Sequence, residues 1–255
     1  MAQAHLSSSF DMAALEAGKH LSQELQDKDS LKSRITIHKL AAELIGTYIL
    51  ILIGIGSILV DQRVKITLLG VAFVWGTVVT VLVYTIGHIS GCHLNPAVTF
   101  AFAVVRQFPW KLVIPYAVVQ VLGAILASVT LRFLFVDIDT DLMLSHPAGS
   151  SSNLSAVACE IIVTFILMFV ICGSATDSMA AKELAGVAIG AAIFCNVLIS
   201  GTISGASMNP ARSLGPAIAT MNFERVWIYV VSPVIGAVFG SALYHFLRLP
   251  KSLIN

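Results

Sequence analysis

One short motif occurs twice in this chain, each time between two apolar segments. The copies are Ile89-Ser-Gly-Cys-His-Leu-Asn-Pro-Ala97 and Ile203-Ser-Gly-Ala-Ser-Met-Asn-Pro-Ala211. Asn directly before Pro is a helix-start signal, because Asn favours the N-cap and Pro the first helical position. Such starts normally lie at the water surface, yet both of these lie between segments apolar enough to cross a bilayer. Irregular backbone at that depth is stable only where it lines a cavity or is buried in protein, so the pair indicates a pore.

Composition places the chain in a membrane. Of its 255 residues, 57% are hydrophobic and 11% are charged, with a mean hydropathy of +0.88, whereas soluble domains carry about 25% charged residues. The net charge of +1 argues against nucleic-acid binding. Residues 1–37 are charged and lack an apolar run, so we expect a flexible or partly helical cytoplasmic tail there, and a short cytoplasmic tail over 249–255.

Six stretches are long enough to span a bilayer, which takes about 20 apolar residues. They lie at roughly 38–60, 67–87, 112–135, 156–175, 183–201 and 226–248. Two shorter apolar stretches, about 95–105 and 209–219, follow the Asn-Pro-Ala triplets and are too short to cross. The sequence therefore predicts an all-α membrane protein whose channel domain, 38–248, has six transmembrane helices and two re-entrant half-helices.

The two motifs belong to a longer internal repeat. Ala42-Glu-Leu-Ile-Gly-Thr-Tyr48 in the first span resembles Cys159-Glu-Ile-Ile-Val-Thr-Phe165 in the fourth. Repeat one covers about 38–135 and repeat two about 156–248, with three spans each. Because three is odd, the second repeat must be inserted upside down, an arrangement known from inverted-repeat transporters. The distribution of Lys and Arg places both termini in the cytoplasm, but does not distinguish the plasma membrane from an intracellular one.

The asparagines of the triplets, Asn95-Pro96-Ala97 and Asn209-Pro210-Ala211, carry the expected chemistry. As an N-cap, each Asn accepts a backbone N–H, which leaves its amide NH₂ group free to point into the lumen. Two such groups at the midplane would occupy the lone pairs of one water, which then could not accept a proton from the next. Each half-helix also places about half a positive charge there, which repels cations.

Backbone carbonyls ahead of the triplets are expected to line a single-file path. Gly91 and Gly205 let the backbone run extended into the membrane. The acceptors would be the carbonyls of Gly91, Cys92, His93, Leu94, Gly205, Ala206 and Ser207. Donors at the centre and acceptors along the wall would provide successive hydrogen-bond partners for water or polyols.

Two acids and one arginine lie within the apolar segments, where a charge is unfavourable. Glu43 and Glu160 occupy equivalent places in the repeats. Their symmetry favours a role in accepting N–H groups of the re-entrant loops, although a proton relay is an alternative. Arg212 follows the second triplet and would place a donor and a fixed positive charge at the narrowest point. No catalytic setting, metal site or cofactor site is expected, and the four cysteines are interpreted as buried thiols, with Cys92 able to line the pore.

The motifs resemble those of the aquaporin and aquaglyceroporin channels, the major intrinsic protein family, over about residues 38–248. Within that family the chain is most similar to plant nodulin-26-like proteins, through the stretches Tyr84-Thr-Ile-Gly-His-Ile-Ser-Gly91, Arg106-Gln-Phe-Pro-Trp110 and Gly205-Ala-Ser-Met-Asn-Pro-Ala-Arg-Ser-Leu-Gly-Pro216. The resemblance implies a homotetramer in the lipid bilayer, with one pore per subunit. It also implies an aromatic/arginine filter, whose four positions fall on Trp75, Val197, Ala206 and Arg212.

That ring predicts passage of polyols as well as water. Val197 stands where water-selective members place His, which leaves room for a solute with its carbons on Trp75 and its hydroxyls toward Arg212. We therefore expect a passive channel, not an enzyme, for water and small neutral solutes such as glycerol, excluding protons and ions. The alternatives are a channel mainly for ammonia, urea or metalloid hydroxides, a secondary transporter, and a docking protein in which permeation is incidental.

Overall fold

The computed structural model describes the backbone of residues 2–249 and the side chains of residues 31–249. The chain divides into two compact units, residues 1–39 and 40–255. Helix α1, Ala2–Val64, runs through the first unit into the second. The C-terminal tail predicted over 249–255 lies, apart from Leu249, outside the described residues.

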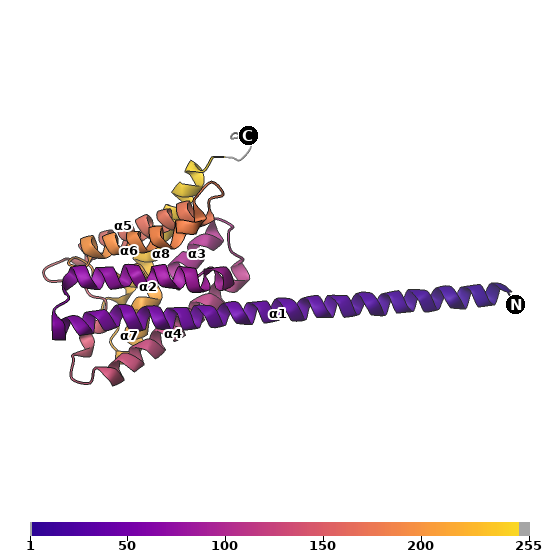
Figure 1. The fold of residues 1–255 in the computed structure, drawn as a ribbon, viewed down its shortest axis with the longest axis horizontal. Coiled ribbons are helices and arrows are strands. Elements are labelled where there is room, and N and C mark those ends of the chain that lie inside the picture. Colours follow the sequence, from indigo (N-terminus) through magenta and orange to yellow (C-terminus); the bar gives the residue numbers. More distant parts are fainter. Residues whose placement is uncertain (1, 250–255) are drawn as a thin grey trace. The chain divides into compact units, whose positions relative to one another are not determined.

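The second unit is a bundle of helices (Figure 1). After α1 come α2 (Thr67–Ser90), α3 (Pro96–Val104), α4 (Val113–Leu134), α5 (Asn153–Ile171), α6 (Ala185–Ser200), α7 (Pro210–Thr220) and α8 (Val226–Leu247). Short 3₁₀ turns lie at Trp110–Leu112, Thr140–Met143 and Lys182–Leu184, and one π-helical turn at Cys172–Thr176 follows α5. No strand occurs among residues 2–249.

Six helical segments of the described chain are long and apolar enough to cross a membrane. They are Leu31–Val64, Thr67–Ser90, Trp110–Leu134, Asn153–Thr176, Lys182–Ser200 and Val226–Leu247. Each overlaps one predicted span. The helices after the two triplets, α3 and α7, have 9 and 11 residues. At 1.5 Å per residue they are too short for a hydrocarbon core of about 30 Å. The predicted fold class, six spans and two half-helices, is confirmed.

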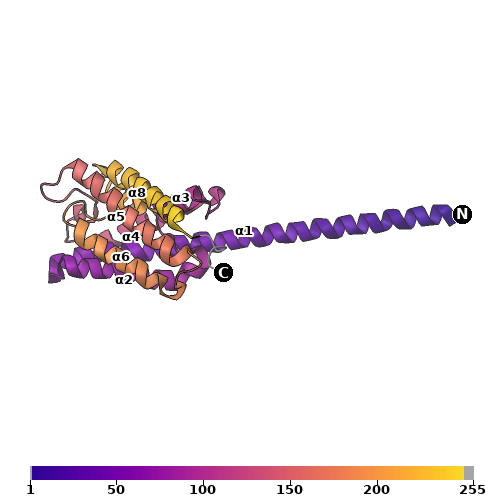
Figure 2. The same cartoon turned by 90° about the horizontal axis from the view of Figure 1, so that it is seen from above.

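The two repeats interlock. α2 packs against α6, α4 against α7, and α3 against α8, so each half-helix is held by a span of the other repeat; Figures 1 and 2 show α2 beside α6. Equivalent glycines permit two close crossings. A Cβ on Gly123 of α4 would overlap the carbonyl oxygen of Leu44 in α1, and one on Gly236 of α8 would overlap that of Ile161 in α5. Small residues at such crossings let membrane helices approach closely.

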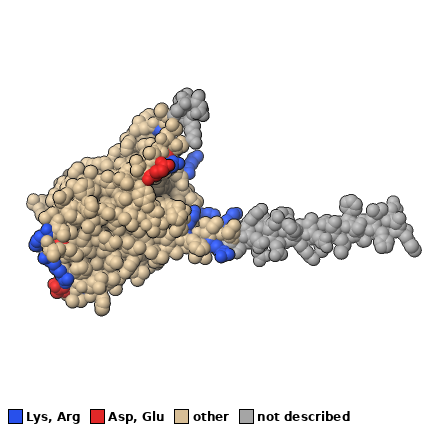
Figure 3. Space-filling view, in the orientation of Figure 1, with Lys and Arg blue, Asp and Glu red and all other residues tan. Residues whose placement is uncertain are grey.

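The outer surface of the bundle is apolar between its ends. On the face shown in Figure 3, Lys, Arg, Asp and Glu gather at the ends and leave the middle free of charge. Large apolar side chains point outward, among them Phe133 and Phe246, which are 80% and 83% exposed. Such a surface would be unfavourable in water and suits contact with lipid.

Candidate functional site

The two asparagines cap the half-helices as their sequence predicts. Asn95 and Asn209 have extended backbones with φ of −155° and −149°, and Pro follows each at the first helical position. Asn95 Oδ1 accepts the N–H of Ala97 at 2.9 Å, and Asn209 Oδ1 accepts that of Ala211 at 2.9 Å. The usual N-cap hydrogen bond therefore forms at the start of both half-helices.

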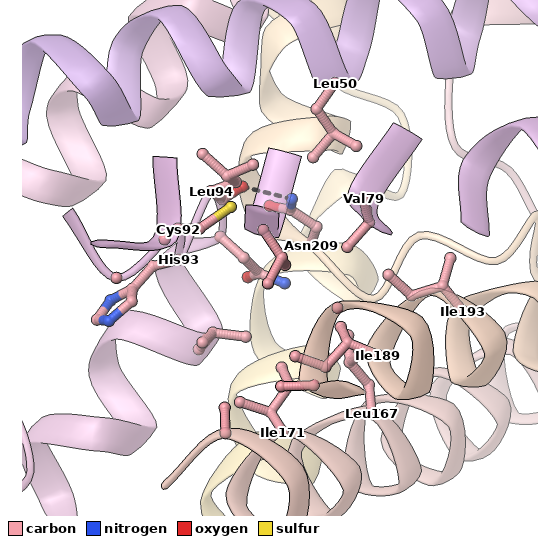
Figure 4. A pocket seen from close by; sticks show the side chains of 18 of the residues that line it. Leu50, Val79, Cys92, His93, Leu94, Leu167, Ile171, Ile189, Ile193 and Asn209 are labelled. Atoms are coloured by element: carbon pink, nitrogen blue, oxygen red, sulfur yellow. Dashed lines mark hydrogen bonds between the residues drawn. The ribbon is translucent and has the colours of Figure 1, made fainter. Parts of the chain in front are cut away.

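The amide groups of the same residues join the two re-entrant loops. Asn95 Nδ2 donates to the carbonyl of Met208 at 2.7 Å, and Asn209 Nδ2 donates to the carbonyl of Leu94 at 2.8 Å (dashed in Figure 4). We expected the whole NH₂ group of each Asn to be free. That expectation needs correction, because one of the two N–H groups of each amide reaches across to the opposite loop. The ends of α3 and α7 therefore meet, although their sequences are far apart.

The backbone of the two loops repeats the same unusual geometry. Cys92 and Leu94 have φ of 50° and 52°, and their counterparts Ala206 and Met208 have 53° and 55°. Residues with a side chain rarely adopt this left-handed region, and do so where the surroundings compensate. The first copy of the motif is thus a structural as well as a sequence repeat of the second.

Glu43 provides that compensation in the first loop. Its carboxylate accepts the N–H groups of His93 at 2.9 Å and Leu94 at 2.7 Å, the hydroxyl of Ser90 at 2.6 Å and the amide of Gln120 at 2.8 Å. Glu43 is fully buried in α1. A carboxylate held by four donors has few lone-pair sites left for a solute.

Glu160 does the same for the second loop from α5. It accepts the N–H groups of Ser207 at 2.8 Å and Met208 at 2.7 Å, and the hydroxyl of Ser204 at 2.7 Å. Tyr229 adds a bond from its hydroxyl to the carbonyl of Ser204 at 2.8 Å.

Sequence reasoning missed several of these partners. Tyr116 donates to the carbonyl of Ser90 at 2.9 Å, which matches the bond from Tyr229 to Ser204 in the other repeat. Ser90 and Ser204 are the serines of the two Ile-Ser-Gly triplets, so the repeat itself contained a signal for them. Gln120 had no such signal, because its donation to Glu43 depends on how α4 packs.

A cavity of about 550 Å³ runs past the two asparagines. One side of it is apolar, formed by Leu50, Val79, Leu167, Ile189 and Ile193 (Figure 4). The loop residues Gly91, Cys92, His93, Leu94, Ala206, Ser207 and Met208 and the two asparagines line it as well. Gly205 is not among its lining residues; its carbonyl accepts Arg212 Nη2 at 3.3 Å. The cavity is therefore lined by the two re-entrant loops and by aliphatic side chains.

Trp75, Val197, Ala206 and Arg212 all line this cavity. The guanidinium carbon of Arg212 lies 5.8 Å from the centre of the Trp75 ring, within the range of a cation–π contact. Arg212 is buried, and its Nη1 donates to the hydroxyl of Ser145, a residue that sequence reasoning missed. The structure thus brings together four residues from α2, α6 and the second re-entrant segment.

Three aromatic rings pack around the imidazole of His93. Its ring centre lies 5.0 Å from that of Phe102, 4.8 Å from that of Phe108 and 5.4 Å from that of Tyr116. These contacts hold the His93 side chain in the bundle. Among the residues whose side chains are described, no group of three His, Cys, Asp or Glu could hold a metal ion.

Asp177 organises the loop between α5 and α6, where Thr176 and Lys182 line the cavity. Its carboxylate accepts the N–H of Met179 at 2.9 Å and the hydroxyl of Tyr244 at 2.9 Å, and Arg248 Nε lies 3.6 Å away. These hydrogen bonds, the backbone one first, and then the charge of Arg248 lower the pKa of Asp177 below its ordinary value of 3.8. The loop is therefore tied to the end of α8 by an ionised carboxylate.

Comparison with known proteins agrees with this architecture. Residues 30–244 match the model of the family described as "Major intrinsic protein". The chain is 51% identical over 232 residues to Nodulin-26 of Glycine max, covering 90% of this chain and 85% of that protein. It is 52% identical over 214 residues to Aquaporin NIP1-1 of Oryza sativa subsp. japonica, covering 83% and 75%.

A solved structure shares the fold. The X-ray structure of the aquaglyceroporin from Plasmodium falciparum superposes with a TM-score of 0.74 at 25% identity, covering 82% of this chain and 95% of that one. The family match, the plant relatives and the shared fold confirm the resemblance seen in the sequence. The chain belongs to the major intrinsic protein family, the channels for water and small solutes.

Proposed function

We propose that this protein is a passive channel for water and small neutral polyols such as glycerol, and that it excludes protons and ions. The observation that carries the proposal is the reciprocal bond of the two asparagines, each from one half-helix to the loop of the other. These two hydrogen bonds hold the amide groups of Asn95 and Asn209 at one place along the cavity.

The second N–H of each asparagine amide is the proposed binding group for the solute. An amide NH₂ carries two N–H groups, and one of each pair is used in the loop contact. The remaining two would hold a passing oxygen by its lone pairs, so a water there donates outward in both directions and cannot relay a proton. The N-termini of α3 and α7 add about half a positive charge each, which opposes cations.

Trp75, Val197, Ala206 and Arg212 form the proposed selectivity filter. Arg212 offers N–H donors to a hydroxyl, Trp75 offers an apolar face to the carbon chain, and Val197 and Ala206 leave room for it. A polyol has this same division, with hydroxyls on one side and carbon on the other. The aquaglyceroporin of similar fold supports glycerol as a solute of this chain.

The buried acids support passive conduction over transport coupled to protons. Glu43 and Glu160 accept four and three hydrogen bonds, so most of their lone pairs are used to support the re-entrant loops. A carboxylate that carried protons would need access to the path. We also propose, from the family resemblance and the Lys and Arg distribution, a homotetramer with both termini in the cytoplasm.

Stopped-flow light scattering on proteoliposomes tests the proposal. Glycerol and water should equilibrate faster than in protein-free liposomes, at a rate independent of pH and ion gradients. A panel with urea, ammonia and boric acid ranks the other neutral solutes. Glycerol flux no faster than in protein-free vesicles would refute the polyol assignment, and flux that follows a proton gradient would refute passive conduction.

A further inference from the structure

Three buried serine hydroxyls connect Arg212 to the backbone of Asn209. Arg212 Nη1 contacts Ser145 Oγ, which lies 2.6 Å from Ser213 Oγ. Ser213 Oγ lies 2.6 Å from Ser207 Oγ, and Ser207 Oγ donates to the carbonyl of Asn209 at 3.1 Å. The serines come from the α4–α5 linker, the second re-entrant loop and the first turn of α7, so only the tertiary structure assembles them.

Counting protons shows which group donates and which accepts in each of these hydrogen bonds. A serine hydroxyl has one hydrogen to donate. Ser207 uses its hydrogen on the carbonyl of Asn209, so Ser213 must donate to Ser207. Ser145 must then donate to Ser213, and its lone pair accepts the N–H of Arg212. All bonds therefore point the same way, from a fixed positive charge to a carbonyl, an arrangement in which each bond strengthens the next.

Arg212 has few other anchors. Nη2 reaches the carbonyl of Gly205 at a long 3.3 Å, and Nε has no partner among the described residues. The Trp75 ring lies on the cavity side, where it does not fix the guanidinium plane by hydrogen bonds. The orientation of the Arg212 head group therefore depends mainly on Ser145, and that of Ser145 on Ser213.

We propose that Ser145 and Ser213 are positioning residues that set solute selectivity by orienting Arg212. The inference rests on the proposed function, in which Arg212 belongs to the filter. It assigns a role in selectivity to the linker between α4 and α5, which carries Ser145 but contributes no side chain to the cavity wall.

The glycerol-to-water permeability ratio of purified variants in proteoliposomes tests this role, because a ratio does not depend on how much protein is reconstituted. Ser145→Ala and Ser213→Ala should each change the ratio about threefold or more, in the direction that Arg212→Ala changes it. Added to Arg212→Ala, Ser213→Ala should change nothing further. Ser145→Thr keeps the hydroxyl and should retain a ratio near that of the wild type.

Ser241→Ala is the matched control, since Ser241 is equally buried but bonds only within α8, to the carbonyl of Val238. It should leave the ratio unchanged. If Arg212→Ala changes the ratio while both serine variants keep the wild-type value, the positioning role is wrong and the filter stands. If Arg212→Ala itself keeps the wild-type value, the filter assignment fails. Should Ser213→Ala not fold, Ser145→Ala decides alone.

Discussion

Glu160→Ala should detach the second re-entrant loop from α5. The substitution removes the acceptor of three hydrogen bonds, from the N–H groups of Ser207 and Met208 and from the hydroxyl of Ser204. The hydroxyl can rotate toward the carbonyl of Ser200, which already lies 3.5 Å away. The two backbone N–H groups cannot rotate and remain buried without a partner.

The magnitude follows from those two orphaned groups. A buried donor without a partner destabilises by about 1–3 kcal/mol, so Glu160→Ala should lower the free energy of unfolding by about 2–6 kcal/mol. Glu160→Gln keeps one acceptor oxygen but turns an NH₂ group toward the other N–H. It should lower the free energy of unfolding by about half as much as Glu160→Ala. Because Met208 has a φ of 55°, loss of the carboxylate also lets the strained loop relax away from its place beside the cavity, and the water permeability per protein chain should fall.

Thermal or denaturant unfolding of the detergent-solubilised protein measures the first effect, and stopped-flow water permeability the second. Thr164→Val is the matched control, because Thr164 is equally buried in α5 and its hydroxyl bonds only to the carbonyl of Glu160 in its own helix. It should lower the stability by less than either Glu160 variant. Unfolding of Glu160→Ala indistinguishable from the wild type would refute the loop-support role.

Three further predictions concern the filter, the loop and the helix crossing. Val197→His adds three side-chain heavy atoms, so it should narrow the ring and lower the glycerol-to-water permeability ratio at least about tenfold, which a single methylene can achieve in a fitted pocket; an unchanged ratio would place Val197 outside the filter. Asp177→Asn should be less stable than the wild type at neutral pH. Because the pKa of Asp177 is lowered from 3.8, this difference should persist above that value and vanish as the pH falls below it; a difference that vanished toward high pH would contradict the assignment. Gly236→Ala should separate α5 from α8 and lower the free energy of unfolding by about 1–3 kcal/mol. A Cβ added at Gly87 would meet no atom closer than 3.9 Å, so Gly87→Ala should not lower the free energy of unfolding in this way. Equal melting temperatures of the two variants would refute the close-crossing argument.

Elements set by local chemistry could be predicted from the sequence. The starts of α3 and α7 follow from Asn before Pro, which determines cap and first helical residue without help from the rest of the chain. The spans follow from apolar length, and the inverted arrangement from an odd number of spans in each repeat. The loop bonds of Glu43 and Glu160 were anticipated for a related reason, because equivalent acids in two repeats suggest an equivalent structural task.

Contacts between distant segments escaped sequence reasoning. The donation of each asparagine amide to the opposite loop requires that two half-helices meet, and the residue type alone left both N–H groups free. Gln120 and Ser145 carry no repeat or motif signal, since their partners are chosen by how α4 and the α4–α5 linker pack.

Taken alone, the sequence determined that this chain lies in a membrane, where its helices begin, and that two copies of one unit face in opposite directions. Those properties depend on short-range backbone chemistry and on the transfer of apolar side chains out of water. Only the tertiary structure decided which donor meets which acceptor around the cavity, including the serine chain behind Arg212. A hydrogen bond requires two groups within about 3 Å, and for residues far apart in sequence that distance is set by the packing of the whole bundle.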